Sequence, residues 1–206
     1  MILLANPNTN AQTTKAMCAI AARLLPEVQG WTARQGADLI HTPALLAQAG
    51  DQIAQLQPTQ GCRGVIVSAF GDPGAVRLAA RLKIPVIGIG AAAAQAAGAG
   101  ERSFAVATTT PQLVKGIDRL MKAHAGQGRY LGCFLTDGPT LSVMKDPALL
   151  DRELLDAARR AAAAGAQAVI IGGGPLAEAA QRIDAPCPVP LIQPIPEAAA
   201  LMRALT

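Results

Sequence analysis

The sequence predicts an α/β protein made of two similar halves, and three observations carry this prediction. Short β-branched runs alternate with helical patterns along the chain, which is typical of parallel sheets covered by helices. Several of these runs end in small or polar residues just before a helix begins, as strands do at the ligand-binding edge of open α/β sheets. The same order of features also returns in the second half of the chain. We therefore expect two pseudo-symmetric, Rossmann-like α/β halves whose parallel sheets face a shared cleft.

The internal repeat consists of three matched pairs of segments. Residues 1–9 match 103–111, residues 65–76 match 169–179, and residues 84–87 match 189–192. The first pair is a strand with a polar loop, the second is a strand followed by small residues and a proline, and the third is a strand that contains a proline. Three features in one order indicate two homologous halves. We expect domains at 1–98 and 99–193, with 194–206 packing back on the first.

Each half is expected to contain four strands and four helices. In the first half, strands are predicted at 1–5, 31–34, 64–69 and 84–90, and helices at 11–25, 42–57, 72–82 and 91–97. In the second half, strands are predicted at 103–107, 129–136, 168–171 and 188–192, and helices at 110–123, 148–164, 175–183 and from 196 onward. Val65-Ile66-Val67 is typical of a strand buried on both faces. Asp72 is a good N-cap before Pro73.

Composition narrows the possible classes of protein. The chain has 206 residues, of which 51% are hydrophobic and 16% charged, so it can bury a core and is not disordered. Its longest apolar run contains proline and glycine and is too short to span a bilayer. The first residues lack a basic segment and turn polar at Asn6, which favours a strand over a signal peptide. A cytoplasmic protein without membrane contact is expected.

Charge and cysteine content suggest the kind of partner. The net charge is +4, but aromatic residues make up only 2% and the basic residues are scattered, so no nucleic-acid surface is expected. A small, anionic molecule is the expected substrate. The four cysteines are widely spaced with no histidine nearby, which predicts reduced thiols and neither a metal nor a cofactor.

The loops after the strands carry the candidate binding groups. Neutral donors and acceptors stand at equivalent strand ends of the two halves, where they could bind a substrate or simply cap the helices that follow; they are Asn6, Asn8, Thr9, Thr108, Thr109 and Thr110. Gly172, Gly173 and Gly174 allow either a tight turn or close approach of a substrate to backbone N–H groups. Ala69, Phe70 and Gly71 stand at the corresponding strand end of the first half.

Two residues near that strand end are candidates for catalysis. Asp72 offers a carboxylate that could activate a water molecule, and the alternative is a helix cap. Ser68 is a possible nucleophile, although no neighbouring base is visible in the sequence.

Five segments together resemble a known family. They are Asn6-Pro7-Asn8-Thr9, Phe70-Gly71-Asp72-Pro73-Gly74, Pro85-Val86-Ile87-Gly88-Ile89-Gly90, Thr108-Thr109 and Val189-Pro190-Leu191-Ile192. With them the chain resembles the aspartate/glutamate/hydantoin racemase superfamily, and within it the hydantoin and allantoin racemases. The Phe-Gly-Asp-Pro-Gly run is the most specific of the five.

The resemblance implies two pseudo-symmetric α/β domains with a cofactor-free active site between them, and homo-oligomers. It also implies two cysteines, one per half, that remove and return a proton on opposite faces of a substrate carbon. Ala69 and Gly173 stand where this family would have those cysteines, and Ala91 stands where it would have a glutamate.

Because both thiols are replaced, the sequence predicts a departure from two-cysteine racemisation. Our first hypothesis is a cofactor-independent enzyme that hydrolyses, or eliminates a group from, a small hydantoin- or thiohydantoin-like ring, including possible desulfurisation, with Asp72 as the general base. The first alternative is a hydantoin, allantoin or amino-acid racemase that uses groups other than cysteine. The second alternative is a small-molecule binding protein without catalysis.

Overall fold

The computed structural model describes all residues from 1 to 206 and contains two four-stranded parallel sheets. The first sheet consists of β1 (Ile2–Asn6), β2 (Val28–Thr32), β3 (Gly64–Val67) and β4 (Val86–Gly88) in the order β2-β1-β3-β4. The second consists of β5 (Ser103–Thr108), β6 (Arg129–Leu135), β7 (Ala168–Ile171) and β8 (Leu191–Ile192) in the order β6-β5-β7-β8. The two orders are equivalent strand by strand. The predicted pair of parallel-sheet α/β halves is therefore confirmed.

Nine helices connect and cover the strands. They are α1 (Ala11–Ala21), α2 (Pro43–Ala54), α3 (Ala75–Ala79), α4 (Ile89–Gly98), α5 (Val114–His124), α6 (Thr140–Val143), α7 (Pro147–Ala163), α8 (Ala177–Arg182) and α9 (Pro194–Leu205). Side-chain caps begin three of them. Asn10 accepts from the Thr13 N–H, Thr42 accepts from the Leu45 N–H, and Asp146 caps α7. Such caps satisfy backbone donors that the first turn of a helix leaves free.

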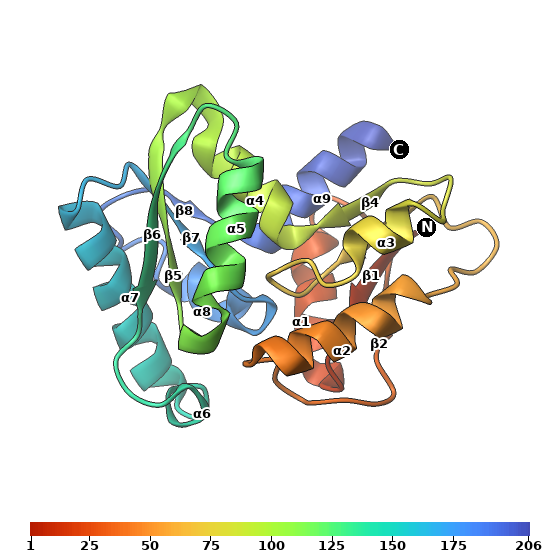
Figure 1. Cartoon of the computed structure of the whole chain (residues 1–206), viewed down its shortest axis with the longest axis horizontal. Helices are drawn as coiled ribbons and strands as arrows, with labels where there is room; N and C mark the ends of the chain where they lie inside the picture. Colours follow the sequence, from red (N-terminus) through yellow and green to blue (C-terminus); the bar gives the residue numbers. More distant parts are fainter.

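Helices α4 and α9 each pack on the sheet of the other half. Helix α4 follows β4 of the first sheet, yet it packs against β5, β7 and β8 of the second. Helix α9 follows β8 of the second sheet, yet it packs against β3, β4 and α1 of the first. Figure 1 shows both helices between the first half, coloured red to yellow, and the second half, coloured green to blue. The boundary at residue 98 stays a prediction.

The two halves share one hydrophobic core. A single cluster of 28 buried residues includes Leu4 and Ile66 from the first sheet together with Val106 and Ile170 from the second. Smaller clusters fill the outer faces, under α2 and α3 in the first half and under α7 in the second. Because both sheets contribute to the same cluster, the two halves are joined by one continuous hydrophobic core.

Several elements differ from the sequence prediction. Helix α3 has only five residues, since Asp72 and Gly74 have positive φ values of 50° and 73° and keep the chain out of the helix until Ala75. Asp72 therefore does not cap the helix that follows it. Thr110 makes no capping hydrogen bond, and a 3-10 turn over Pro111–Leu113 precedes α5. Strand β2 lies earlier than the predicted 31–34, and its pairing places Ile2 opposite Val28.

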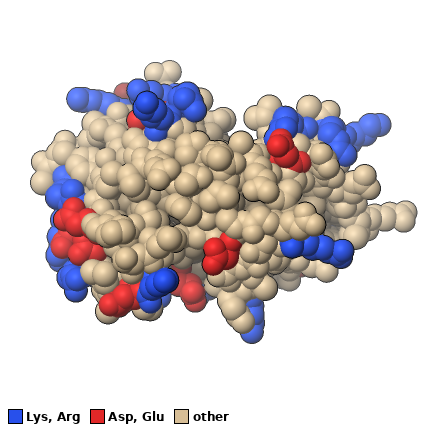
Figure 2. All heavy atoms as spheres, turned by 60° about the horizontal axis from the view of Figure 1, so that its bottom comes forward, with Lys and Arg blue, Asp and Glu red and all other residues tan.

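The surface carries charges of both signs. Figure 2 shows one face of the molecule, on which Lys and Arg side chains stand in small groups, often beside Asp or Glu, with wide areas that carry neither. Ion pairs such as Arg182 with Asp151, at 2.6 Å, belong to this pattern. No helix is both long enough and apolar enough to cross a membrane.

Candidate functional site

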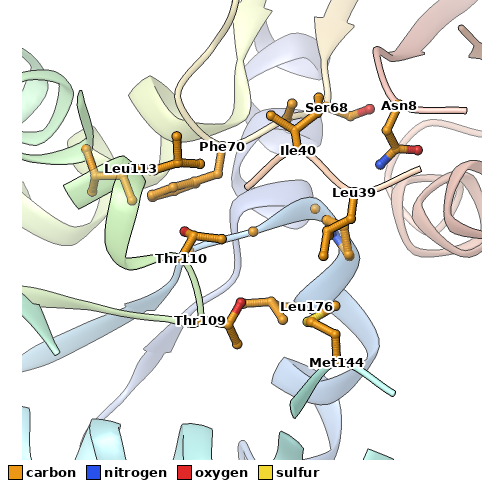
Figure 3. A pocket seen from close by; sticks show the side chains of 16 residues that line it. Asn8, Leu39, Ile40, Ser68, Phe70, Thr109, Thr110, Leu113, Met144 and Leu176 are labelled. Carbon is orange, nitrogen blue, oxygen red and sulfur yellow. The ribbon is translucent and has the colours of Figure 1, made fainter. Parts of the chain in front are cut away.

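A cavity lies between the carboxyl ends of the two sheets (Figure 3). Its walls come from the ends of β1, β3, β5 and β7 and from loops of both halves. The lining residues are Asn8, Leu39, Ile40, Ser68, Ala69, Phe70, Thr109, Thr110, Leu113, Ile117, Met144, Gly172, Gly173, Gly174, Pro175 and Leu176. The cavity is partly open and has a volume of about 40 Å³, which is room for a few water molecules. The expected cleft at the strand ends is therefore a small cavity with a mostly apolar wall.

Asn8 presents a free amide donor to this cavity. Its Oδ1 accepts from Asn6 Nδ2 at 2.8 Å and from the Asn10 N–H at 2.9 Å. These two bonds fix which end of the amide is oxygen, and Nδ2 has no hydrogen-bond partner within the protein. In Figure 3 the Asn8 side chain points toward the cavity from the β1 side. Asn8 can therefore donate to an oxygen of a bound molecule.

Asn6 and Thr9, which were expected to bind substrate, do not line the cavity. Asn6 is fully buried, accepts from the Asn8 N–H at 3.1 Å, and donates to Thr14 Oγ1 at 2.9 Å. The Thr9 N–H donates to the Ala37 carbonyl at 3.0 Å. Asn6 holds the loop in shape, because every polar group of its side chain is already used inside the protein, and Thr9 contributes through its backbone N–H.

The three threonines after β5 have different roles. Thr108 donates its hydroxyl proton to the Gly172 carbonyl at 2.9 Å and so links β5 to β7. The Thr110 hydroxyl, 3.1 Å away, must then donate to Thr108, which leaves Thr110 as an acceptor toward the cavity. The Thr109 hydroxyl has no partner in the protein and lines the cavity. Of the three, Thr109 and Thr110 lie in the cavity wall and Thr108 lies behind it.

Backbone N–H groups add donors from both halves. Those of Ala69, Phe70, Thr109 and Thr110 make no hydrogen bond within the protein, and all four residues line the cavity. Gly71, the other residue expected here, lies outside the lining. Unpaired N–H groups around a partly enclosed space can stabilise an oxygen that gains negative charge.

The three consecutive glycines after β7 also line the cavity. A Cβ on Gly172 would lie 2.7 Å from Val106 Cγ1, and one on Gly174 would lie 2.6 Å from the Ser68 carbonyl oxygen. A Cβ on Gly173 would meet only Leu176, at 3.0 Å, and its backbone is extended. Gly172 and Gly174 are thus required for close packing, whereas Gly173 has room for a side chain if Leu176 moves slightly.

The two candidate catalytic side chains are both engaged elsewhere. Asp72 does not line the cavity; its Oδ1 accepts from the Gly90 N–H and its Oδ2 from the Ala91 N–H, each at 2.7 Å. Burial raises the pKa of Asp72 to about 6, although these two hydrogen bonds act in the opposite direction. Ser68 lines the cavity but donates to the Ala5 carbonyl at 2.9 Å. The expectation that Asp72 acts as a general base in the cleft therefore does not fit its position.

None of the cavity-lining side chains is ionisable, and the four cysteines lie elsewhere as free thiols. Cys133 sits with Tyr130 and Asp118, and burial raises the pKa of its thiol to about 12, so it is a weak nucleophile. Ala69 and Gly173 line the cavity from opposite halves. No group of His, Cys, Asp or Glu side chains is arranged to hold a metal ion.

Sequence reasoning missed the apolar part of the wall. Leu39 and Ile40 come from the loop between β2 and α2, Met144 follows α6, and Leu113 and Ile117 belong to the segment after β5. Apolar residues in loops and helices resemble core residues in the sequence, so nothing in the pattern marks them as cavity walls.

The fold and the cavity define a class of proteins in which two pseudo-symmetric α/β halves share a site at the facing edges of their parallel sheets. A family model described as Asp/Glu/Hydantoin racemase matches residues 2–202, and the chain belongs to this family. The family resemblance seen in the sequence is confirmed. The family is one of racemases, a class of isomerase enzymes.

Three relatives illustrate this membership. A hydantoin racemase from Rhizobium meliloti is 29% identical over 214 residues, covering 99% of this chain and 88% of that protein. The solved structure of an allantoin racemase from Klebsiella pneumoniae is 28% identical with a TM-score of 0.84, covering 99% of this chain and 86% of that one. An allantoin racemase from Pseudomonas fluorescens is 25% identical with a TM-score of 0.83, covering 99% and 89%.

Proposed function

We propose that this protein is an isomerase that exchanges the proton on a carbon beside a carbonyl group, in a small ring of the hydantoin or allantoin type. The observation that carries the proposal is the set of unpaired donors contributed to one cavity by both halves, namely Asn8 Nδ2, the Thr109 hydroxyl and backbone N–H groups. The names of the relatives support the choice of ring, since they are hydantoin and allantoin racemases.

The donors would act on the charge that develops during the reaction. Removing a proton beside a carbonyl places negative charge on the carbonyl oxygen, and fixed N–H and O–H groups stabilise that oxygen more in the transition state than in the ground state. The wall holds neither Lys nor Arg, so a neutral ring suits it better than the anionic substrate expected from net charge.

The ring carbon would lose its proton to a solvent hydroxide ion, which becomes water, and a water molecule on the other face would return a proton and so regenerate hydroxide. No lining side chain is ionisable, and the cavity has room for water molecules in the space that Ala69 and Gly173 border. Leu39 and Ile40, from the loop between β2 and α2, would lie against one side of the bound ring.

Hydrolysis or elimination, our first hypothesis from the sequence, is less well supported than isomerisation. Each of the three relatives described above is a racemase, and Asp72, the intended general base, lies outside the cavity. A binding protein without catalysis is the second candidate. The observation that favours it is the absence of any ionisable side chain from the cavity wall.

One experiment separates these functions. The purified protein is incubated in D2O with enantiopure 5-substituted hydantoins, allantoin and 2-thiohydantoins, and proton NMR and circular dichroism are followed against a protein-free blank. Loss of the C5 proton signal and of optical activity with the ring intact supports the isomerase. Ring-opened or desulfurised products would support hydrolysis or elimination instead. Binding shifts without either change would support the binding protein.

A matched pair of variants links the activity to the cavity. Thr109→Val removes the free hydroxyl from the wall and is expected to slow the exchange at least about tenfold, as loss of one oxyanion donor does. Thr59→Val makes the same change at an exposed position far from the cavity wall and should leave the rate unchanged.

A further inference from the structure

Asp72 connects the turn after β3 to the start of α4. Both oxygens of its carboxylate are bound, one by the Gly90 N–H and one by the Ala91 N–H, at 2.7 Å each. Helix α4 has no capping side chain at its own N-cap residue, Gly88, so Asp72 supplies the cap from another part of the chain. The positive end of the helix dipole also favours a carboxylate there.

The glycines around α4 make room for this contact. A Cβ on Gly88 would collide with the Asp72 carboxyl group, and a Cβ on Gly90 would come 3.1 Å from its Oδ1. Asp72 itself has a φ of 50°, a left-handed conformation that costs a non-glycine residue energy. The surrounding structure thus holds the side chain in one defined place.

The same turn carries part of the cavity wall. The Asp72 N–H donates to the Ala69 carbonyl at 3.0 Å, which closes the turn over Ala69, Phe70 and Gly71. Ala69 and Phe70 line the cavity and contribute two of its unpaired N–H groups. Any displacement of Asp72 from α4 would therefore move these donors.

Helix α4 links this turn to the second half. It packs against α5, whose Ile117 lines the cavity, and against β7, which leads into Gly172. In addition, Leu120 of α5 lies beside Gly90, so that a Cβ added to Gly90 would collide with Cδ2 of Leu120. Through α4, Asp72 fastens one wall of the cavity to elements that form the opposite wall.

We propose that Asp72 is a positioning residue that anchors the turn bearing Ala69 and Phe70 to the start of α4, and thereby sets the donor geometry of the cavity. This inference rests on the proposed function for its effect on rate, but its structural part can be tested separately. It assigns Asp72 a role without contact to substrate, in place of proton transfer.

The charged groups near Asp72 determine whether a pH titration there reports the protonation of Asp72 itself. Neither β4 nor α4 contains an ionisable side chain. Arg77 of α3 pairs with Asp51 at 2.8 Å, while Asp118 of α5 accepts from Tyr130 at 2.8 Å. The other charged residues of α5, Lys115, Arg119, Lys122 and His124, are exposed. Burial without a charged neighbour raises the pKa of Asp72 to about 6, so protonation weakens the anchor within an accessible pH range.

The structural test is a pH titration of backbone amides by 15N NMR between pH 5 and 8. The amides of Gly90 and Ala91 and those of Ala69 and Phe70 are expected to shift together with one midpoint near pH 6. Asp72→Asn should abolish this shared transition, whereas Asp51→Asn, which removes an exposed carboxylate, should retain it. A transition in Gly90 and Ala91 alone would show that Asp72 serves only α4 and would overturn the proposal.

The kinetic test uses the C5 proton exchange defined above. Asp72→Asn is expected to lower kcat about tenfold or more with a smaller change in KM, since donors that are displaced lose transition-state contacts. Below pH 6 the wild-type kcat should fall more steeply than the kcat of Asp72→Asn, because only the wild type also loses the anchor. An unchanged kcat and pH profile in a folded Asp72→Asn would refute the positioning role. If the wild type exchanges no ring at all, the proposed function fails while the amide titration still decides on Asp72.

Discussion

Gly174 of the second half lies directly against the carbonyl oxygen of Ser68 in the first half, so closely that a Cβ on Gly174 would come within 2.6 Å of it. The two halves therefore touch through backbone at the cavity, where the segments that follow β3 and β7 meet. We expect Gly174→Ala to lower the free energy of unfolding by about 1–3 kcal/mol, the usual cost of overpacking. Gly116→Ala, in α5 with nothing near its added Cβ, should be neutral or stabilising in the same thermal or urea denaturation.

Thr108 and Thr109 are adjacent but should respond differently to the same substitution. Thr108→Val removes a buried hydroxyl that bonds to Gly172 and Thr110, so we expect a loss of about 1–3 kcal/mol in the free energy of unfolding. Thr109→Val, whose hydroxyl has no partner, should change stability by less than about 1 kcal/mol while slowing the exchange reaction. Equal destabilisation by both substitutions would contradict the assignment of Thr109 to binding.

Asn8 can be tested by a nearly isosteric change. Asn8→Asp keeps the oxygen that accepts from Asn6 and Asn10 but replaces the free donor by a second, charged oxygen. We expect the affinity for a hydantoin ring to fall about tenfold or more, because a donor is lost and an acceptor faces the carbonyl. Asn10→Asp, at the exposed N-cap of α1, keeps its capping acceptor and should leave affinity unchanged in isothermal titration calorimetry. An unaltered affinity in Asn8→Asp would exclude Asn8 from the binding site.

Asp72 should also make stability depend on pH in an unusual direction. Its pKa in the folded protein is about 6, compared with 3.8 for an unperturbed Asp, so the folded state holds this proton more tightly than the unfolded state. Ionised Asp72 therefore costs stability above pH 6, and this cost disappears as the pH falls toward 4. The difference corresponds to about 2 kcal/mol between pH 7 and pH 4. Denaturation of wild type and Asp72→Asn at both pH values measures it, and parallel profiles would contradict the raised pKa.

Much of the fold follows from local sequence. The internal repeat predicts two equivalent sheets because strand, loop and helix signals recur in one order, and the buried runs of β3 and β7 lie where their β-branched residues indicate. We expected residues 194–206 to pack back on the first half, but the return of α4 to the second sheet is a long-range choice between two apolar faces, and no local pattern distinguishes them.

The site was predictable only in part. Asn8, Thr109 and the glycines follow strand ends, so the rule for open α/β sheets places them at the cavity. Asp72 also follows a strand end, but its left-handed backbone turns the carboxylate toward α4, and a φ value cannot be read from the residue type. Leu39 and Met144 reach the cavity only because their loops fold over it.

The exchange of α4 and α9 makes each half of the chain depend on the other half for part of its core. Each sheet buries its inner face under a helix encoded at the end of the other half. A chain consisting of one half alone would lack that cover, and a second copy could restore it by lending its terminal helix in return. The present chain contains both partners of such a reciprocal pair in one covalent unit, so we expect its halves to unfold together.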